Sequence, residues 1–262
     1  MIQTICHFLI SVVVTMVLIG QAGGLLAADW GTLSGRVVLD GKAPESQPIK
    51  PAKDQFCMTA GPPNETLMVG EDGGLANVVI YIRVKRGQSL EVHPDYDPQL
   101  SEEVVLDNKG CQFVPHIALI RTGQPLVVRN SDPTGHNTNA SLAKNGAFNV
   151  LIAANQSQKM TLSKAESLPL PVQCNVHPFM KGYMLVRDDP YMTVTDETGA
   201  FEISKIPAGN HEFQFWQERI GYLKNCQYEG GELNRRGRVK LDIQGGADLD
   251  LGKIEVPASL IK

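Results

Sequence analysis

Short runs of β-branched and aromatic residues, each bounded by Gly, Pro, Asn or Asp, recur along most of this 262-residue chain. Runs of this kind are typical of strands, and many short strands with frequent turn signals are typical of β-sandwiches. Long helical periodicity is nearly absent beyond the apolar N-terminus, and the proline-containing segment 91–101 indicates a loop. We therefore predict an all-β fold with strands at 33–39, 77–85, 125–129, 148–152, 159–162, 183–186, 191–195, 201–203, 211–216 and 238–243.

The N-terminus and the charge place limits on where the protein works. Residues 2–20 form an apolar run and residues 25–28 end in small side chains, a pattern that predicts a secretory signal at 1–28. No Lys or Arg precedes this run, and it is long enough to remain as an uncleaved membrane anchor. We expect an exported protein, periplasmic or extracellular, with membrane attachment only if the segment is uncleaved. The formal net charge of −4 does not indicate a nucleic-acid partner.

The sequence Cys-Asn-Val-His-Pro-Phe-Met at 174–180 places a thiol, an imidazole and a thioether within one short turn, and His136 lies upstream. Two His, one Cys and one weakly held Met are the ligands of mononuclear electron-transfer copper sites. We therefore predict one copper ion per chain, bound by His136, Cys174, His177 and Met180. One alternative is that Cys174 and His177 form half of a zinc site, but such a site needs a second Cys/His pair at similar spacing. The other is a free Cys followed by a core Met.

The loop at 174–180 resembles the ligand loop of amicyanin-type cupredoxins, in its spacing and in the Pro-Phe pair between His and Met. The strand pattern that leads to His136 is similar to that family as well. The resemblance covers residues 101–188 and implies a cupredoxin Greek-key sandwich. It implies that Met180 is the axial ligand and that the other three residues are equatorial ligands. It also implies that Asn137 braces the ligand loop.

The two ends of the chain resemble parts of a second family. Residues 31–41 are similar to the opening strand of a carboxypeptidase regulatory-like, transthyretin-type sandwich, and residues 195–209 are similar to its central hairpin. Neither piece makes a full sandwich. We therefore predict a discontinuous domain of 29–88 and 190–258, with the cupredoxin domain of 101–188 inserted between its parts. The alternative is two sequential domains without an insertion.

Together these patterns predict a non-catalytic protein that carries single electrons between redox proteins. His177 is expected to present its ring edge near the surface as the electron's exit, with Pro178 and Phe179 beside it as an apolar docking patch. A copper storage or delivery protein would use the same ligands, and a binding or adhesion module would keep the copper for structure alone. A multicopper oxidase needs several His-x-His pairs, and none occurs among the six histidines. His116 is interpreted as a structural histidine, with a second metal site as the alternative.

The cysteines fit an oxidising compartment. Cys6 belongs to the predicted signal and Cys174 to the copper site, which leaves Cys57, Cys111 and Cys226. One disulfide and one free thiol is the natural outcome, and three unpaired thiols are the alternative. All three pairings are open, and Cys57–Cys111 is favoured because Cys226 lies in a polar, Gly-flanked segment.

Overall fold

The computed structural model describes residues 30–261, so the predicted signal at 1–28 lies outside the described residues. The fold is all-β, as predicted. None of the helices within the described part of the chain is long and apolar enough to cross a bilayer. In chain order the elements are β1 (Trp30–Asp40), α1 (Gln55–Ala60), β2 (Val79–Ile82), η1 (Pro94–Tyr96), η2 (Pro98–Ser101), β3 (Val104–Asn108), β4 (Phe113–Val114), β5 (Ile117–Arg121), β6 (Pro125–Asn130), β7 (His136–Leu142), β8 (Gly146–Ile152), β9 (Ser157–Thr161), β10 (Leu170–Gln173), β11 (Lys181–Arg187), β12 (Met192–Val194), β13 (Ala200–Pro207), β14 (Gly209–Gln217), β15 (Gly221–Tyr222), β16 (Gln227–Tyr228), β17 (Gly231–Glu232), β18 (Arg238–Ile243), β19 (Asp248–Pro257) and η3 (Ala258–Leu260).

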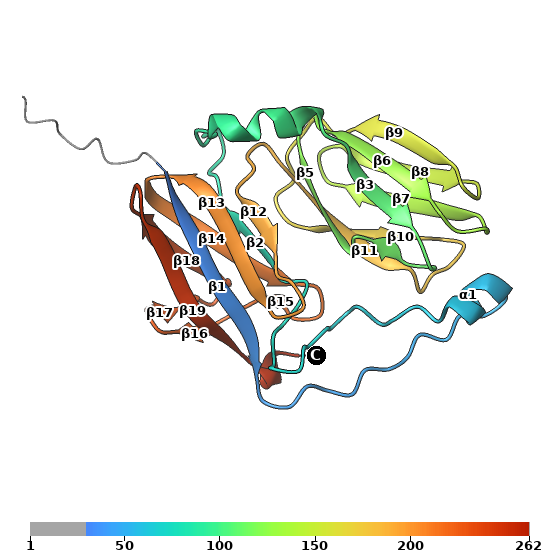
Figure 1. The fold of residues 1–262 in the computed structure, drawn as a ribbon, viewed down its shortest axis with the longest axis horizontal. Helices are drawn as coiled ribbons and strands as arrows, with labels where there is room; N and C mark the ends of the chain where they lie inside the picture. The colour runs from blue at the N-terminus through green and yellow to red at the C-terminus, as the bar shows by residue number, and fades with distance from the viewer. Residues whose placement is uncertain (1–29, 262) are drawn as a thin grey trace, which may run out of the picture.

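The strands form sheets that pack as two sandwiches (Figure 1). In the first sandwich, a sheet of order β13-β1-β19-β16-β17 faces a sheet of order β12-β2-β14-β15, with β18 beside β14. In the second sandwich, a sheet of order β5-β11-β10-β7-β8 faces a sheet of order β4-β3-β6-β9. The first sandwich therefore takes strands from both ends of the chain, and β1 lies in the middle of its sheet, between β13 and β19.

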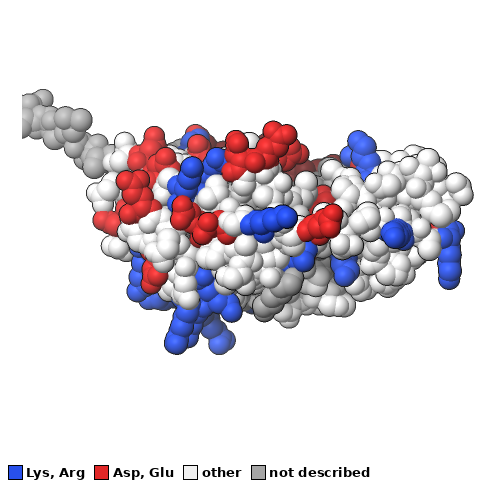
Figure 2. Space-filling model, turned by 90° about the horizontal axis from the view of Figure 1, so that it is seen from below, with Lys and Arg blue, Asp and Glu red and all other residues white. Residues whose placement is uncertain are grey.

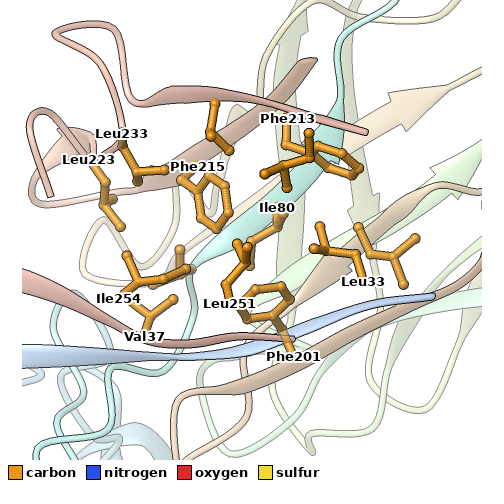
Figure 3. Packing of buried hydrophobic residues seen from close by; sticks show 14 of the residues in the cluster. Leu33, Val37, Ile80, Phe201, Phe213, Phe215, Leu223, Leu233, Leu251 and Ile254 are labelled. Atoms are coloured by element: carbon orange, nitrogen blue, oxygen red, sulfur yellow. The ribbon is translucent and has the colours of Figure 1, made fainter. Parts of the chain in front are cut away.

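The first sandwich closes over a large apolar core (Figure 3). Leu33 of β1 faces this core together with Ile80 of β2, and the rings of Phe201 and Phe215 meet edge to face with their centroids 5.9 Å apart. An added Cβ at Gly35 would lie 2.9 Å from the ring of Phe201, so glycine leaves the space that this ring occupies. Each fully buried side chain of this size stabilises the fold by about 1.5–3 kcal/mol relative to exposure.

The strand β2 is buried on both faces, which joins the two sandwiches. Its residues alternate, as the strand period requires. Ile80 and Ile82 enter the core of the first sandwich, whereas Val79 and Tyr81 enter a separate cluster with Leu185 of the second sandwich. The sheets that face each other across this cluster therefore pack through apolar side chains rather than through a hydrated linker.

A long connection, which we call the strap, comprises residues 41–78 between β1 and β2. It leaves β1, runs to the far end of the second sandwich, forms α1 there and returns to β2 (Figure 1). The helix α1 begins where Asp54 accepts a hydrogen bond from the backbone N–H of Cys57, 3.0 Å. It ends at Gly61, which adopts the left-handed conformation with φ 58° that favours glycine at this position.

We expect that a fragment of residues 190–262 does not fold alone. Its strand β13 pairs with β1, and β19 pairs with β1 along eight residue pairs, so removal of β1 leaves two open sheet edges. Thermal unfolding followed by circular dichroism should show no cooperative transition for this fragment. A cooperative transition would favour sequential domains over the predicted insertion.

Candidate metal centre

Strand pairing brings the separated histidine and the ligand loop to one end of the second sandwich. The strands β7 and β10 run antiparallel, with Gln173 opposite Asn139. The last residue of β10 is therefore close to the start of β7, where His136 lies. Cys174 follows β10 directly, and the loop returns to the sheet at β11 immediately after Met180.

Three donor atoms converge at this end. The Nδ1 atoms of His136 and His177 are 2.9 Å apart, and the Sγ atom of Cys174 lies 3.9 Å from the first and 3.8 Å from the second. Atoms that share one ion at about 2.0–2.3 Å lie roughly 3–4 Å apart, so these separations fit a common ion. All three side chains are buried, and Met180 beside them is 1% exposed. The structure thus brings together three of the four residues that the sequence predicts as ligands, and Met180 closes the same turn through a hydrogen bond from its backbone N–H to the carbonyl of His177 at 2.8 Å.

Asn137 holds the ligand loop in its turn. Its Oδ1 atom accepts hydrogen bonds from the backbone N–H groups of Asn175 and Val176, at 2.8 and 3.1 Å, and lies 3.4 Å from the Sγ atom of Cys174. Its Nδ2 atom donates to Asn149 of β8 at 2.7 Å. The side chain therefore links the loop to the sheet, in the position that the resemblance implied for it.

Each imidazole has a carboxylate on its outer nitrogen. The Nε2 atom of His136 is 2.9 Å from Asp132 Oδ2, and the Nε2 atom of His177 is 3.1 Å from Asp54 Oδ2. A proton on Nε2 donates to the carboxylate and leaves Nδ1 free to bind a metal. Burial holds the pKa of His136 below its usual value despite Asp132, which favours the neutral ring that a metal requires.

Asp54 reaches the site from the strap, and its carboxylate is fixed by several partners. Thr134 Oγ1 donates to Oδ2 at 2.8 Å, and the backbone N–H of Cys57 donates to Oδ1. This backbone hydrogen bond is the main cause that holds the pKa of Asp54 below its ordinary range. The strap leaves His177 only 4% exposed, so the expectation that its ring edge lies at the surface is wrong.

A disulfide ties the strap to the second sandwich. It joins Cys57 to Cys111, and its sulfurs lie within 4.8 Å of ring nitrogens of His177 and His136 respectively. This is the pairing that the sequence favoured, although the reason was wrong. Cys226 does not lie in an exposed polar segment but is fully buried in the core of the first sandwich, and burial raises the pKa of its thiol to about 12.

The two residues of the predicted docking patch differ in exposure. Pro178 is exposed, but Phe179 is only partly exposed, and its ring centroid lies 5.7 Å from that of His177. Both residues line a groove of about 220 Å³ whose other wall includes Pro62 and Pro63 of the strap. The strap therefore occupies part of the surface on which a partner was expected to dock.

Searches for similar proteins found matches among solved structures, whereas no family model and no curated protein matched. A mutant of amicyanin in its reduced Cu(I) form is 19% identical over 41% of this chain and 98% of its own, with a TM-score of 0.30. A copper-containing nitrite reductase from Thermus scotoductus is 19% identical over 40% of this chain and 25% of its own, with a TM-score of 0.29. A purple cupredoxin from Nitrosopumilus maritimus is 16% identical over 32% of this chain and 97% of its own, with a TM-score of 0.27. No shared function follows from similarity this low.

Two carboxylates of the site were not identified from the sequence. Asp132 lies four residues before His136, and this short spacing was the available signal. Asp54 is 123 residues from His177 and lies in a segment without strand or helix periodicity, so no local pattern marks it.

His116 does not belong to the metal centre. Its Nε2 atom is 2.5 Å from Glu218 Oε1 of the first sandwich, and its Nδ1 atom is 3.3 Å from Glu65 Oε2 of the strap. Burial opposes protonation of the ring, but the hydrogen bonds and charges of the two carboxylates outweigh it and raise the pKa of His116 to about 9. The residue is a protonated link between both sandwiches and the strap.

We expect the contribution of His116 to stability to depend on pH. Its pKa is raised on folding, from 6.5 to about 9, so its stabilisation is complete below about pH 6.5 and is lost as the pH rises through 9. A pKa difference of this size corresponds to about 3 kcal/mol. Urea unfolding at pH 6 and pH 10 should show that His116→Gln narrows the gap between the two free energies of unfolding. An unchanged gap would contradict this assignment.

Proposed function

We propose that this chain is an exported mononuclear copper protein that carries single electrons, with His136, Cys174, His177 and Met180 as its ligands. The observation that carries the proposal is the convergence of two Nδ1 atoms and one thiol sulfur at 2.9–3.9 Å in a buried site. Soft sulfur, imidazole nitrogen and a nearby thioether suit copper better than they suit Mg²⁺ or Ca²⁺. Bound copper supplies reversible one-electron transfer between Cu(I) and Cu(II).

The residues of the site perform the tasks that such a carrier needs. Cys174 binds as a thiolate and provides the covalent link that couples the metal electronically to the chain. Asn137 keeps the loop in place, and the two carboxylates keep both Nδ1 atoms pointed inward. A site held in this way does not have to rearrange when its charge changes by one.

Electron transfer is favoured over catalysis and over copper delivery by the enclosure of the site. A catalytic metal keeps a coordination position open to substrate, whereas His136 and Cys174 are fully buried and His177 almost so. Delivery requires ready exchange of the metal, and the disulfide-bound strap closes the outer side of the site. A structural metal in a binding module remains the second candidate, because it needs the same enclosure.

The partner we propose is another redox protein. The disulfide Cys57–Cys111 suits export to an oxidising compartment. Figure 2 shows that the end of the molecule with the second sandwich has few charged side chains on this face, and those that show there are mostly Lys and Arg. A surface with little charge suits a weak, brief encounter with small buried area.

We expect the copper-loaded, oxidised protein to have an intense visible colour that ascorbate bleaches, because Cu(II)–thiolate charge transfer absorbs strongly. Cys174→Ser should lose the colour, since a hydroxyl group does not ionise as a thiol does. Cys226→Ser is the matched control, because this buried thiol belongs to the other sandwich, and it should keep the colour. A colourless Cu(II) form of the unaltered protein would rule out the proposed function.

We also expect that Met180→Leu retains copper and colour but raises the reduction potential. A thioether donates weakly along the axis and stabilises Cu(II) slightly, whereas an alkyl group does not. The exchange nearly conserves volume, so unfolding of the apo-protein should change by less than about 1.5 kcal/mol. Protein-film voltammetry measures the potential, and a lower value would show that Met180 is not the axial donor.

A further inference from the structure

We infer that Asp54, supplied by the strap, is a positioning residue that orients His177 and stabilises the Cu(II) form of the centre over the Cu(I) form. The inference rests on the proposed copper site and extends it beyond the second sandwich. It makes the centre a composite of two parts of the chain that are joined only through the fold.

The contacts of Asp54 divide between its two carboxylate oxygens. Oδ1 accepts the backbone N–H of Cys57 and caps α1. Oδ2 faces His177 Nε2 at 3.1 Å and also accepts from Thr134 Oγ1 at 2.8 Å. The oxygen that meets the imidazole is therefore not free to rotate away, because the other oxygen is held by the helix.

The backbone around Asp54 is anchored as well. Cys57, three residues further on, is bonded to Cys111, and Phe56 packs against the core of the second sandwich. The hydrogen-bonded carboxylate is thus delivered at a fixed place, which is the condition for a residue that orients a ligand.

The negative charge of Asp54 determines which oxidation state of the copper is stabilised. The thiolate of Cys174 leaves one net positive charge on a Cu(II) centre and none on a Cu(I) centre. A carboxylate beside a buried ligand attracts the positive centre and also makes the imidazole a stronger donor. Both effects favour Cu(II), so Asp54 lowers the reduction potential.

The test is Asp54→Asn in the full chain. Asparagine is a good N-cap and keeps an oxygen for the N–H of Cys57, but it removes the negative charge beside His177. Loss of such an outer hydrogen-bond partner commonly costs 10–100-fold in metal affinity. If the affinity for Cu(II) falls tenfold while the affinity for Cu(I) is unchanged, the reduction potential rises by about 59 mV. We expect a rise of at least this size by protein-film voltammetry.

The matched control is Glu45→Gln, which removes the same charge from an exposed position on the strap. We expect its potential to equal that of the unaltered protein. Asp54→Ser provides a second variant, because serine also caps the helix but is too short to reach His177. It should raise the potential as the asparagine variant does.

A measurement on the apo-protein tests the orienting role separately. Nitrogen-15 NMR of the His177 ring should show a proton on Nε2, the nitrogen that faces Asp54, and Asp54→Ser should populate a tautomer without that proton as well. A fixed Nε2–H tautomer in that variant would overturn the orienting role.

The outcomes separate this inference from the proposed function. If the unaltered protein forms no coloured, redox-active copper centre, the proposed function fails, and the inference fails with it. If it forms that centre, and both Asp54 variants have the potential of Glu45→Gln, the inference alone is overturned and the proposed function stands.

Discussion

The disulfide between Cys57 and Cys111 holds the strap against the second sandwich, beside the proposed copper site that the strap covers. The strap contains one short helix, and the disulfide adds a covalent anchor to the polar and apolar contacts that this segment makes with both sandwiches. The disulfide closes a loop of 54 residues, which corresponds to about 4 kcal/mol in the chain-entropy account. Because Asp54 precedes Cys57 by one helical turn, the same link determines where its carboxylate lies.

The strap starts and ends in the first sandwich and is anchored by its disulfide to the second sandwich. It can therefore close the site only if the two sandwiches keep a fixed position relative to each other. The strands that are buried on both faces provide this fixed position. Tyr81 of β2 and Leu185 of β11 meet in the apolar cluster between the sandwiches. Arg187 adds a hydrogen bond to the carbonyl of Ile82 at 2.7 Å and lies over the ring of Tyr81 at 5.3 Å. An apolar contact with such polar links resembles a domain core more than a transient interface.

Local signals explain what the sequence predicted and what it missed. Segments such as 211–216, rich in aromatic residues, form strands because their side chains fit a half-buried pleated surface. The strand β7 was missed because His136–Leu142 is rich in Asn and small residues, and it becomes a strand only by pairing with β8 and β10. Similarly, the ligand loop carries a local motif, whereas Asp54 has none. The exposure of His177 was predicted wrongly for the same reason, because exposure is a property of the whole fold.

The enclosure of His177 changes the surface that a redox partner meets. Both the ligand loop and the strap carry an exposed apolar side chain: Val176 is 56% exposed and Met58 is 46% exposed. Val176 belongs to the ligand loop and precedes His177, whereas Met58 belongs to the strap and follows Cys57. Pro178 and Phe179 of the ligand loop and Pro62 and Pro63 of the strap line one groove, so the proposed redox partner would meet a surface built from both segments. The strap begins and ends in the first sandwich. In the proposed copper protein, the first sandwich would therefore shape both the potential of the centre, through Asp54, and the access to it.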